Sequence, residues 1–178
     1  DDVDELGVEE DGNGWRAKAF LYCVEVKCPV SGWLVPLLPN FVVNKTRGII
    51  LRLRPDPIQK RYAIEVLQAT SSRELEECKV GTVQDGDVVH SPDGVNVHRV
   101  SIKAIRGDYR EGGDNKNRLR LWEKTDFVPR PEDVFQERLY CIQWMGHNPN
   151  GSQLEYEYRS ATDDDLEREK RVIRFVSD

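Results

Sequence analysis

Two short loops of this chain have the outline of the turns that hold zinc in a zinc ribbon. They are Cys28-Pro29-Val30-Ser31-Gly32 and His90-Ser91-Pro92-Asp93-Gly94. In a zinc ribbon, two C-P-x-C-G turns bind one tetrahedral ion through their thiolates, and the ion replaces a core too small to hold the hairpins together. Only one of the four ligand positions is a cysteine here, which indicates a metal-stapled module whose staple is weakened or lost.

The four ligand positions correspond to Cys28, Ser31, His90 and Asp93. A serine hydroxyl stays protonated near neutral pH and is a poor zinc ligand. We therefore expect packing and hydrogen bonds to hold the two hairpins, and no cofactor in this chain. The alternative is a residual zinc site with Cys28, His90 and Asp93 as ligands and one open position. A third interpretation is an independent hydrolase that uses a metal at the same three residues.

Other catalytic constellations are absent from the sequence. It has three histidines and contains no G-x-S-x-G, no phosphate-binding glycine loop and no helical histidine pair. His98 lies in an expected strand, and His147 neighbours a loop. We therefore predict that the chain itself is not an enzyme.

Two basic stretches are candidates for contact with nucleic acid. The residues are Arg47, Arg52, Arg54, Lys60 and Arg61 across an expected hairpin, and Arg118, Arg120 and Lys124 along an expected strand near Trp122. Basic side chains on one face of a sheet can follow the phosphates of DNA, and an aromatic neighbour can add stacking. The alternative is that these bases are only the solvent-facing side of half-buried strands.

The elements expected to position these residues are mostly strands. Alternating apolar residues and turn signals predict strands at about 15–26, 33–35, 41–43, 48–53, 61–67, 81–83, 87–89, 119–122, 139–144 and 156–159. Thr162 followed by Asp165 is a helix-capping pattern, so a helix follows Thr162. The expected fold is α+β and β-rich, with degenerate zinc-ribbon-like hairpins, a mixed sheet and one C-terminal helix.

The charge is distributed unevenly along the chain. The first twelve residues hold seven of the 32 acids and none of the 26 bases, so the remainder is close to neutral despite a formal charge of −6. We expect an acidic disordered leader (1–13), a β-rich zinc-ribbon-like region (14–107), a mobile loop (108–117), and strands with the C-terminal helix (118–178). A strongly basic footprint, the usual signature of a nucleic-acid binder, is absent.

Composition narrows the class of protein. The apolar fraction is 38% and the charged fraction 33%, and no stretch approaches the roughly 18 apolar residues that span a bilayer. We expect no membrane partner and, since no signal peptide is visible, a cytoplasmic protein with four free cysteines. The chain has no initiator methionine, which indicates a piece of a longer polypeptide.

Four segments carry a resemblance to a known family. They are CPVSGWLVPLLP (28–39), Gly81-Thr82-Val83 before the second loop, FQERLYCIQW (135–144) and YRSATDDDLERE (158–169). In this order and spacing they resemble the bacterial and archaeal adenine-specific DNA methylases that contain a zinc ribbon, over most of the chain from about residue 18.

The resemblance implies that this region is an insert within the methyltransferase, outside the methyl-transfer core. The cysteine pattern departs from the family at Ser31, His90 and Asp93, and neither a D-P-P-Y-type tetrapeptide nor a glycine-rich cofactor loop is present. S-adenosylmethionine would therefore belong only to the parent protein, meaning the larger polypeptide. We expect a non-catalytic accessory module that positions DNA or braces the parent's remaining domains. The alternative is a structural or protein-interaction domain with no nucleic-acid role.

Overall fold

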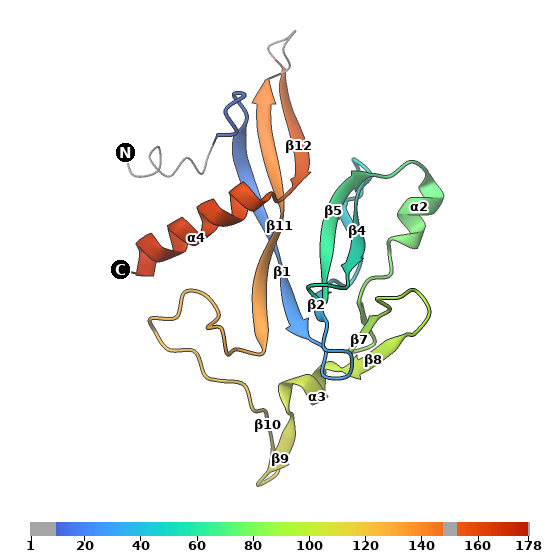
Figure 1. Cartoon of the computed structure of the whole chain (residues 1–178), viewed down its shortest axis with the longest axis vertical. Helices are drawn as coiled ribbons and strands as arrows, with labels where there is room; N and C mark the ends of the chain where they lie inside the picture. The colour runs from blue at the N-terminus through green and yellow to red at the C-terminus, as the bar shows by residue number, and fades with distance from the viewer. Residues whose placement is uncertain (1–9, 148–152, 178) are drawn as a thin grey trace. The chain divides into compact units, whose positions relative to one another are not determined.

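A computed structural model describes residues 10–147 and 153–177 of the chain (Figure 1). The chain divides into two compact units: residues up to Tyr22 together with those from Leu139 onward form the first, and Cys23 to Arg138 form the second. Residues 1–9, most of the expected acidic leader, lie outside the described part. Within that part, no helix is both long and apolar enough to cross a membrane.

The first unit is built on a three-stranded ribbon. Strand β11 (Phe135–His147) pairs antiparallel with β12 (Leu154–Ser160) and has β1 (Arg16–Lys27) on its other side. Its core contains Leu139, Ile142 and Trp144, with Trp15, Ala17, Ala161 and Leu166 packed against them. Trp15 lies directly over Gly146, where an added Cβ would be only 2.4 Å from the indole. This position therefore excludes any larger residue.

Helix α4 (Asp163–Ser177) follows β12, as the capping pattern predicts. The amide of Asp165 donates to Thr162 Oγ1 at 3.2 Å, and the amide of Thr162 donates to Asp165 Oδ2 at 2.8 Å. Three aspartates in the first turn complement the positive end of the helix dipole. Leu166 joins the helix to the core of the first unit.

The second unit contains a mixed sheet. The end of β1 pairs antiparallel with β2 (Leu34–Leu37), and β2 meets β5 (Arg61–Gln68) in parallel. Strand β4 (Ile49–Asp56) pairs antiparallel with β5 along its whole length, and β3 (Val42–Asn44) pairs with β4. The buried cluster of this unit consists of Val26, Cys28, Trp33, Val35, Tyr62 and Val88.

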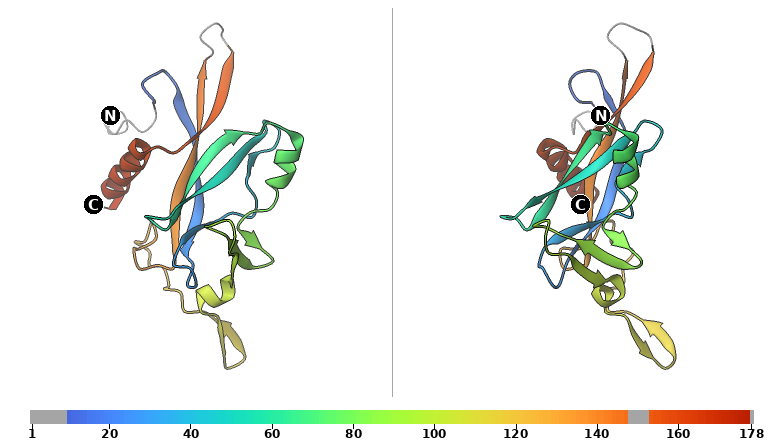
Figure 2. Two further views of the ribbon diagram at one scale, coloured as in Figure 1. Left: turned by 45° about the vertical axis from the view of Figure 1, so that its right-hand side comes forward. Right: turned by 90° about the vertical axis from the view of Figure 1, so that its right-hand side faces the viewer.

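Smaller elements complete the second unit (Figure 2). Helix α2 (Ser72–Glu77) begins at Ser71, whose side chain accepts from the amide of Glu74. A three-stranded sheet follows, formed by β6 (Val83–Gln84), β7 (Asp87–His90) and β8 (His98–Ser101). Next come α3 (Ile102–Arg106) and the hairpin of β9 (Tyr109–Glu111) and β10 (Asp114–Lys116).

Gly81 and Thr82 fasten the small sheet to the chain after β2. Thr82 Oγ1 accepts from the amide of Leu38 at 2.9 Å and donates to the carbonyl of Pro36. An added Cβ at Gly81 would lie 2.1 Å from the Leu38 carbonyl oxygen, so only glycine allows this approach. Two segments that carry the family resemblance therefore contact each other directly.

The α+β, β-rich fold class with a mixed sheet and a C-terminal helix is confirmed. Two local predictions are wrong. Residues 119–122 form no strand, because the Arg120 side chain turns inward onto two aspartates. Residues 108–117, expected as a loop, contain the β9–β10 hairpin, whose turn is made by Gly112 and Gly113, both with positive φ.

Candidate functional site

The two zinc-ribbon-like loops meet in the second unit, as the sequence predicts. The first joins β1 to β2, with the Gly32 amide donating to the Cys28 carbonyl at 2.8 Å. The second follows β7, and its Gly94 has positive φ, as Gly32 does. Ser31 Oγ lies 3.1 Å from His90 Nε2, a contact between residues 59 positions apart in the chain. The two loops therefore contact each other in the folded chain.

A chain of hydrogen bonds joins two of the four candidate ligand positions, Ser31 and His90, to Tyr62. His90 Nδ1 lies 2.9 Å from the hydroxyl of Tyr62, and Ser31 Oγ accepts from the amide of Trp33 at 3.3 Å. In either tautomer of His90, one ring nitrogen donates and the other accepts, so both ring nitrogens are engaged. The side chain of Cys28 is fully buried in the apolar cluster.

Asp93 accepts hydrogen bonds within its own loop. Its carboxylate accepts from the amides of Val95 and Asn96 and from the side-chain amide of Asn96, at 2.6–2.9 Å. These hydrogen bonds lower the pKa of Asp93 well below its ordinary range and stabilise the turn. The Asp93 carboxylate is thus engaged by hydrogen bonds of its own loop.

The residues at the four ligand positions do not fit a tetrahedral zinc site in this arrangement. Within residues 10–147 and 153–177, no group of three or more His, Cys, Asp and Glu side chains is placed to hold a metal ion. Zinc at Cys28, His90 and Asp93 stays the alternative to the expected metal-free loops, and elemental analysis distinguishes the two.

Burial controls the protonation of this cluster. Burial, together with the nearby charge of His98, lowers the pKa of His90 to about 4, and the two rings lie 5.2 Å apart. Burial also raises the pKa of Tyr62 to about 12. At neutral pH both groups are neutral. Such a pair is suited to holding two loops together but not to exchanging protons with a substrate.

The basic residues on the β4–β5 hairpin are largely paired with carboxylates. Arg52 contacts Glu74 at 3.1 Å, Arg54 contacts Glu65 at 2.6 Å, and Arg61 contacts Glu25 at 2.7 Å. The amide of Arg47 donates to Asn44 Oδ1, and Lys60 is exposed in the turn, with positive φ. The hairpin therefore presents alternating charge rather than a basic face.

The second basic stretch is irregular rather than a strand. Arg120 donates to Asp133 through Nε and Nη2 at 2.8 and 2.6 Å, and its Nη1 contacts Asp126 at 2.5 Å. The aliphatic part of Arg118 packs on Gly107, and Lys124 is exposed. Of the eight candidate phosphate-binding residues, Lys60, Arg118 and Lys124 have no carboxylate partner within residues 10–147 and 153–177.

One charged cluster was missed by sequence reasoning. Glu25, only 2% exposed, accepts from Arg61 and, at 2.8 Å, from Arg138 Nη1, which also donates to the Tyr62 carbonyl at 2.7 Å. Burial lowers the pKa of Arg138. A glutamate among apolar residues near the end of β1 was the available signal, but its two partners lie 36 and 113 positions away.

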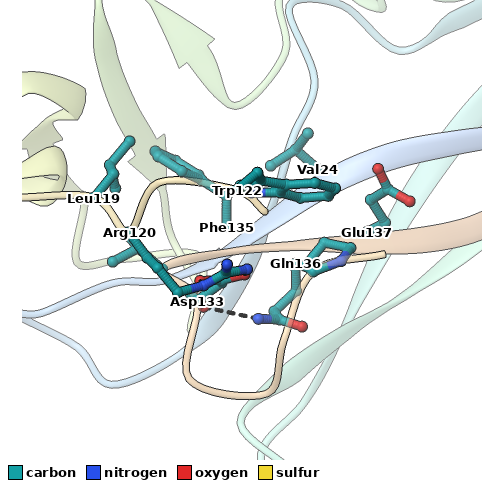
Figure 3. A pocket seen from close by; sticks show the side chains of 10 residues that line it. Val24, Leu119, Arg120, Trp122, Asp133, Phe135, Gln136 and Glu137 are labelled. Atoms are coloured by element: carbon teal, nitrogen blue, oxygen red, sulfur yellow. Dashed lines mark hydrogen bonds and ion pairs between the residues drawn. The ribbon is translucent and has the colours of Figure 1, made fainter. Parts of the chain in front are cut away.

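A pocket of about 280 Å³ opens beside the irregular segment that follows β10 (Figure 3). Its apolar walls are Val24, Leu119, Trp122, Pro129, Val134 and Phe135, and its polar lining is Arg120, Asp133, Gln136 and Glu137. All of these residues belong to the second unit. The sequence signal was the single Trp122 beside the basic residues, which sequence reasoning assigned to stacking on nucleic acid.

Comparison with protein-family models, curated proteins and solved structures finds no match for this chain. The resemblance to zinc-ribbon adenine-specific DNA methylases therefore stays a prediction from the sequence.

Proposed function

We propose that this chain is a non-catalytic protein-interaction module of a larger adenine-specific DNA methyltransferase, and that it binds protein rather than DNA. The methyltransferase part of the proposal rests on the four segments in which the sequence resembles that family. The preference for a protein partner rests on contacts of the second unit. S-adenosylmethionine would then bind only to other parts of the parent protein.

The observation that carries the preference is the ion pairing of the candidate phosphate-binding arginines. Arg52, Arg54 and Arg61 each have a carboxylate oxygen within 3.1 Å. The surface pairs of Arg52 and Arg54 are individually weak, within about 1 kcal/mol. Each one nevertheless places a negative charge where a phosphate would have to approach, so the pairs cancel the local attraction for DNA.

Two of the candidate arginines, Arg61 and Arg120, each make three hydrogen bonds to carboxylates. Arg61 makes three hydrogen bonds to Glu25, and that carboxylate is nearly inaccessible to water. Arg120 is held by two aspartates, whose hydrogen bonds raise the pKa of its guanidinium. Transferring either arginine to a phosphate would remove one cationic partner from a buried carboxylate, which is costly.

The Ser31–His90–Tyr62 chain supports a structural role for the ribbon-like loops. It replaces a metal staple by hydrogen bonds and leaves the only buried histidine of the described residues with both ring nitrogens engaged. A general base must reach the proton that it removes. Because both ring nitrogens of His90 are engaged, His90 holds the two loops together under this proposal and does not act as a general base.

Salt-dependent binding to fluorescent duplex DNA tests the proposal. Wild-type protein should show weak binding with a slope of log K against log salt between zero and about −2, since few unpaired bases remain. The matched variant Glu65→Gln/Glu74→Gln releases Arg52 and Arg54 and should steepen the slope by about 2. A wild-type slope of about −4 or steeper would show a DNA-contacting surface and overturn the proposal.

Binding to the parent protein is the complementary measurement. In a calorimetric titration, this chain should bind the separately produced remaining domains of the methyltransferase. Absence of binding at micromolar concentrations, together with absence of DNA binding, would also overturn the proposal.

A further inference from the structure

We infer that the Trp122 pocket binds a short extended segment of a partner protein in which an aliphatic or proline residue stands next to an arginine or lysine. This inference rests on the proposed function and specifies the partner for it. Four features of the pocket carry it: a rigid support, exposed apolar walls, a small volume and an excess of carboxylates.

The segment that forms one wall is fixed by polar contacts although it has no regular secondary structure. Arg120 joins Asp126 to Asp133, and Arg130 contacts Asp126 at 2.9 Å. Gln136 on β11 donates to the carbonyls of Arg130 and Asp133 at 2.8 and 2.7 Å. A loop held in this way needs little ordering when a ligand binds, which favours affinity.

The walls present apolar surface to solvent. Trp122 is 51% exposed, Val24 40% and Val134 38%, and all three line the pocket. Leu121 and Phe127 in the same segment are also exposed. Exposed apolar residues gathered on one rigid surface mark an interaction site more often than scattered ones do. A tryptophan in such a place is the residue type most often found to dominate a protein interface.

The volume favours a peptide over a small-molecule ligand. At about 280 Å³ the pocket lies at the low end of the range for small-molecule sites. One or two side chains fill such a space, and an extended peptide offers them from a backbone that stays outside. Proline-rich segments bind aromatic-lined grooves in this manner, because their extended backbone is already ordered.

The charges around the pocket favour a cationic group on that peptide. The charged residues that line the pocket are one arginine, Arg120, and two carboxylates, Asp133 and Glu137. Glu137 is exposed, lines the pocket, and has no ion-pair partner in the described part of the chain. A lysine or arginine beside the buried side chain of the peptide would meet this carboxylate.

Nucleic acid is the less favoured occupant of the same surface. The Arg120 guanidinium already lies 6.0 Å from the centre of the Trp122 ring, so one face of the indole has a cation over it. The carboxylates around the pocket would repel the phosphates that accompany any stacked base. Binding of a single strand is therefore treated as an outcome of the test.

The test is selection from a phage-displayed library of random linear peptides on the full chain, followed by fluorescence polarisation with the enriched peptides. The enriched sequences should contain a basic residue next to an apolar one. Trp122→Ala should weaken their binding by about thirtyfold, and Glu137→Gln by about threefold to fivefold, an effect that high salt removes.

Leu121→Ala is the matched control, because Leu121 is 88% exposed in the same segment but does not line the pocket. It should leave peptide affinity unchanged. Because Trp122 is half exposed, Trp122→Ala should keep the melting temperature of the wild type, so lost binding cannot be attributed to unfolding. Enrichment of acidic peptides, no enrichment, equal binding by Trp122→Ala, or tighter binding of oligo-dT than of any peptide would overturn the inference.

The two proposals fail separately. If the remaining domains of the parent bind the chain and Trp122→Ala does not weaken that binding, the module function stands and the pocket assignment fails. If peptides bind at Trp122 while those domains do not, the pocket assignment stands and the methyltransferase-module function fails.

Discussion

Replacing Glu25 with glutamine should be among the most destabilising single changes in this protein. The carboxylate of Glu25 is 2% exposed and accepts hydrogen bonds from Arg61 and Arg138. Removing its charge leaves two guanidinium groups without a counter-charge. Breaking a buried pair by removing one partner costs about 3–5 kcal/mol.

The structure places the expected loss near the lower end of that range. The Arg61 side chain is 36% exposed and can regain water, whereas Arg138 is 16% exposed and keeps only the Tyr62 carbonyl as an acceptor. We therefore expect Glu25→Gln to lower the free energy of unfolding by about 3 kcal/mol and the melting temperature by about 10 °C.

Urea denaturation followed by circular dichroism measures this loss, with Glu77→Gln as the matched control. Glu77 pairs with Arg73 at 2.9 Å, but both side chains are mostly exposed, so its loss should cost less than about 0.5 kcal/mol. The double change Glu25→Met/Arg138→Met should recover part of the stability, because it removes the stranded charge. If Glu25→Gln costs no more than Glu77→Gln, the argument from buried charge is refuted.

Three further predictions concern the ribbon-like loops and their support. Because folding lowers the pKa of His90 from 6.5 to about 4, the unfolded chain binds more protons between these values. The free energy of unfolding contributed by neutral His90 should therefore be complete above pH 6.5 and decline as pH falls toward 4, by at most about 3 kcal/mol. Equilibrium unfolding at several pH values measures this decline. An equally steep decline in His90→Gln would contradict the prediction. Gly81→Ala should lower the free energy of unfolding by about 3 kcal/mol, because the new methyl group would meet the Leu38 carbonyl. Gly94→Ala, where nothing lies within 4 Å, should lower it clearly less in the same denaturation assay. Protein purified without chelators should contain no stoichiometric zinc by elemental analysis. Cys28→Ser should lower the free energy of unfolding by about 1 kcal/mol. One equivalent of zinc, or a loss of several kcal/mol in Cys28→Ser, would support the metal-site interpretation instead.

Some features of the fold followed from local sequence alone. The capping pair Thr162 and Asp165 predicted where α4 begins, because both hydrogen bonds of the cap join residues three positions apart. The proline and glycine positions of the two loops predicted their turns, and both Gly32 and Gly94 adopt positive φ. Alternation of apolar residues located the long strands, since side chains of a strand point to opposite faces in turn.

The site could be predicted only in part. That the two loops face each other was expected from their similar outlines, and the Ser31–His90 contact agrees with this. That Tyr62 contacts the second nitrogen of His90, while Asp93 accepts hydrogen bonds within its own loop, was not visible in the sequence. The spacing of candidate ligands predicts which residues approach one another but not the direction in which each side chain points.

Only the tertiary structure determined which basic residues are paired with carboxylates. The basic residues of β4 and of the segment around Arg120 look in the sequence like two stretches that could follow phosphates. Their carboxylate partners, such as Glu74 for Arg52 and Asp133 for Arg120, lie 22 and 13 positions away and are brought to them by folding. Turns, caps and strand faces depend on neighbours along the chain, whereas ion pairs and pockets depend on which distant segments the packed core holds together.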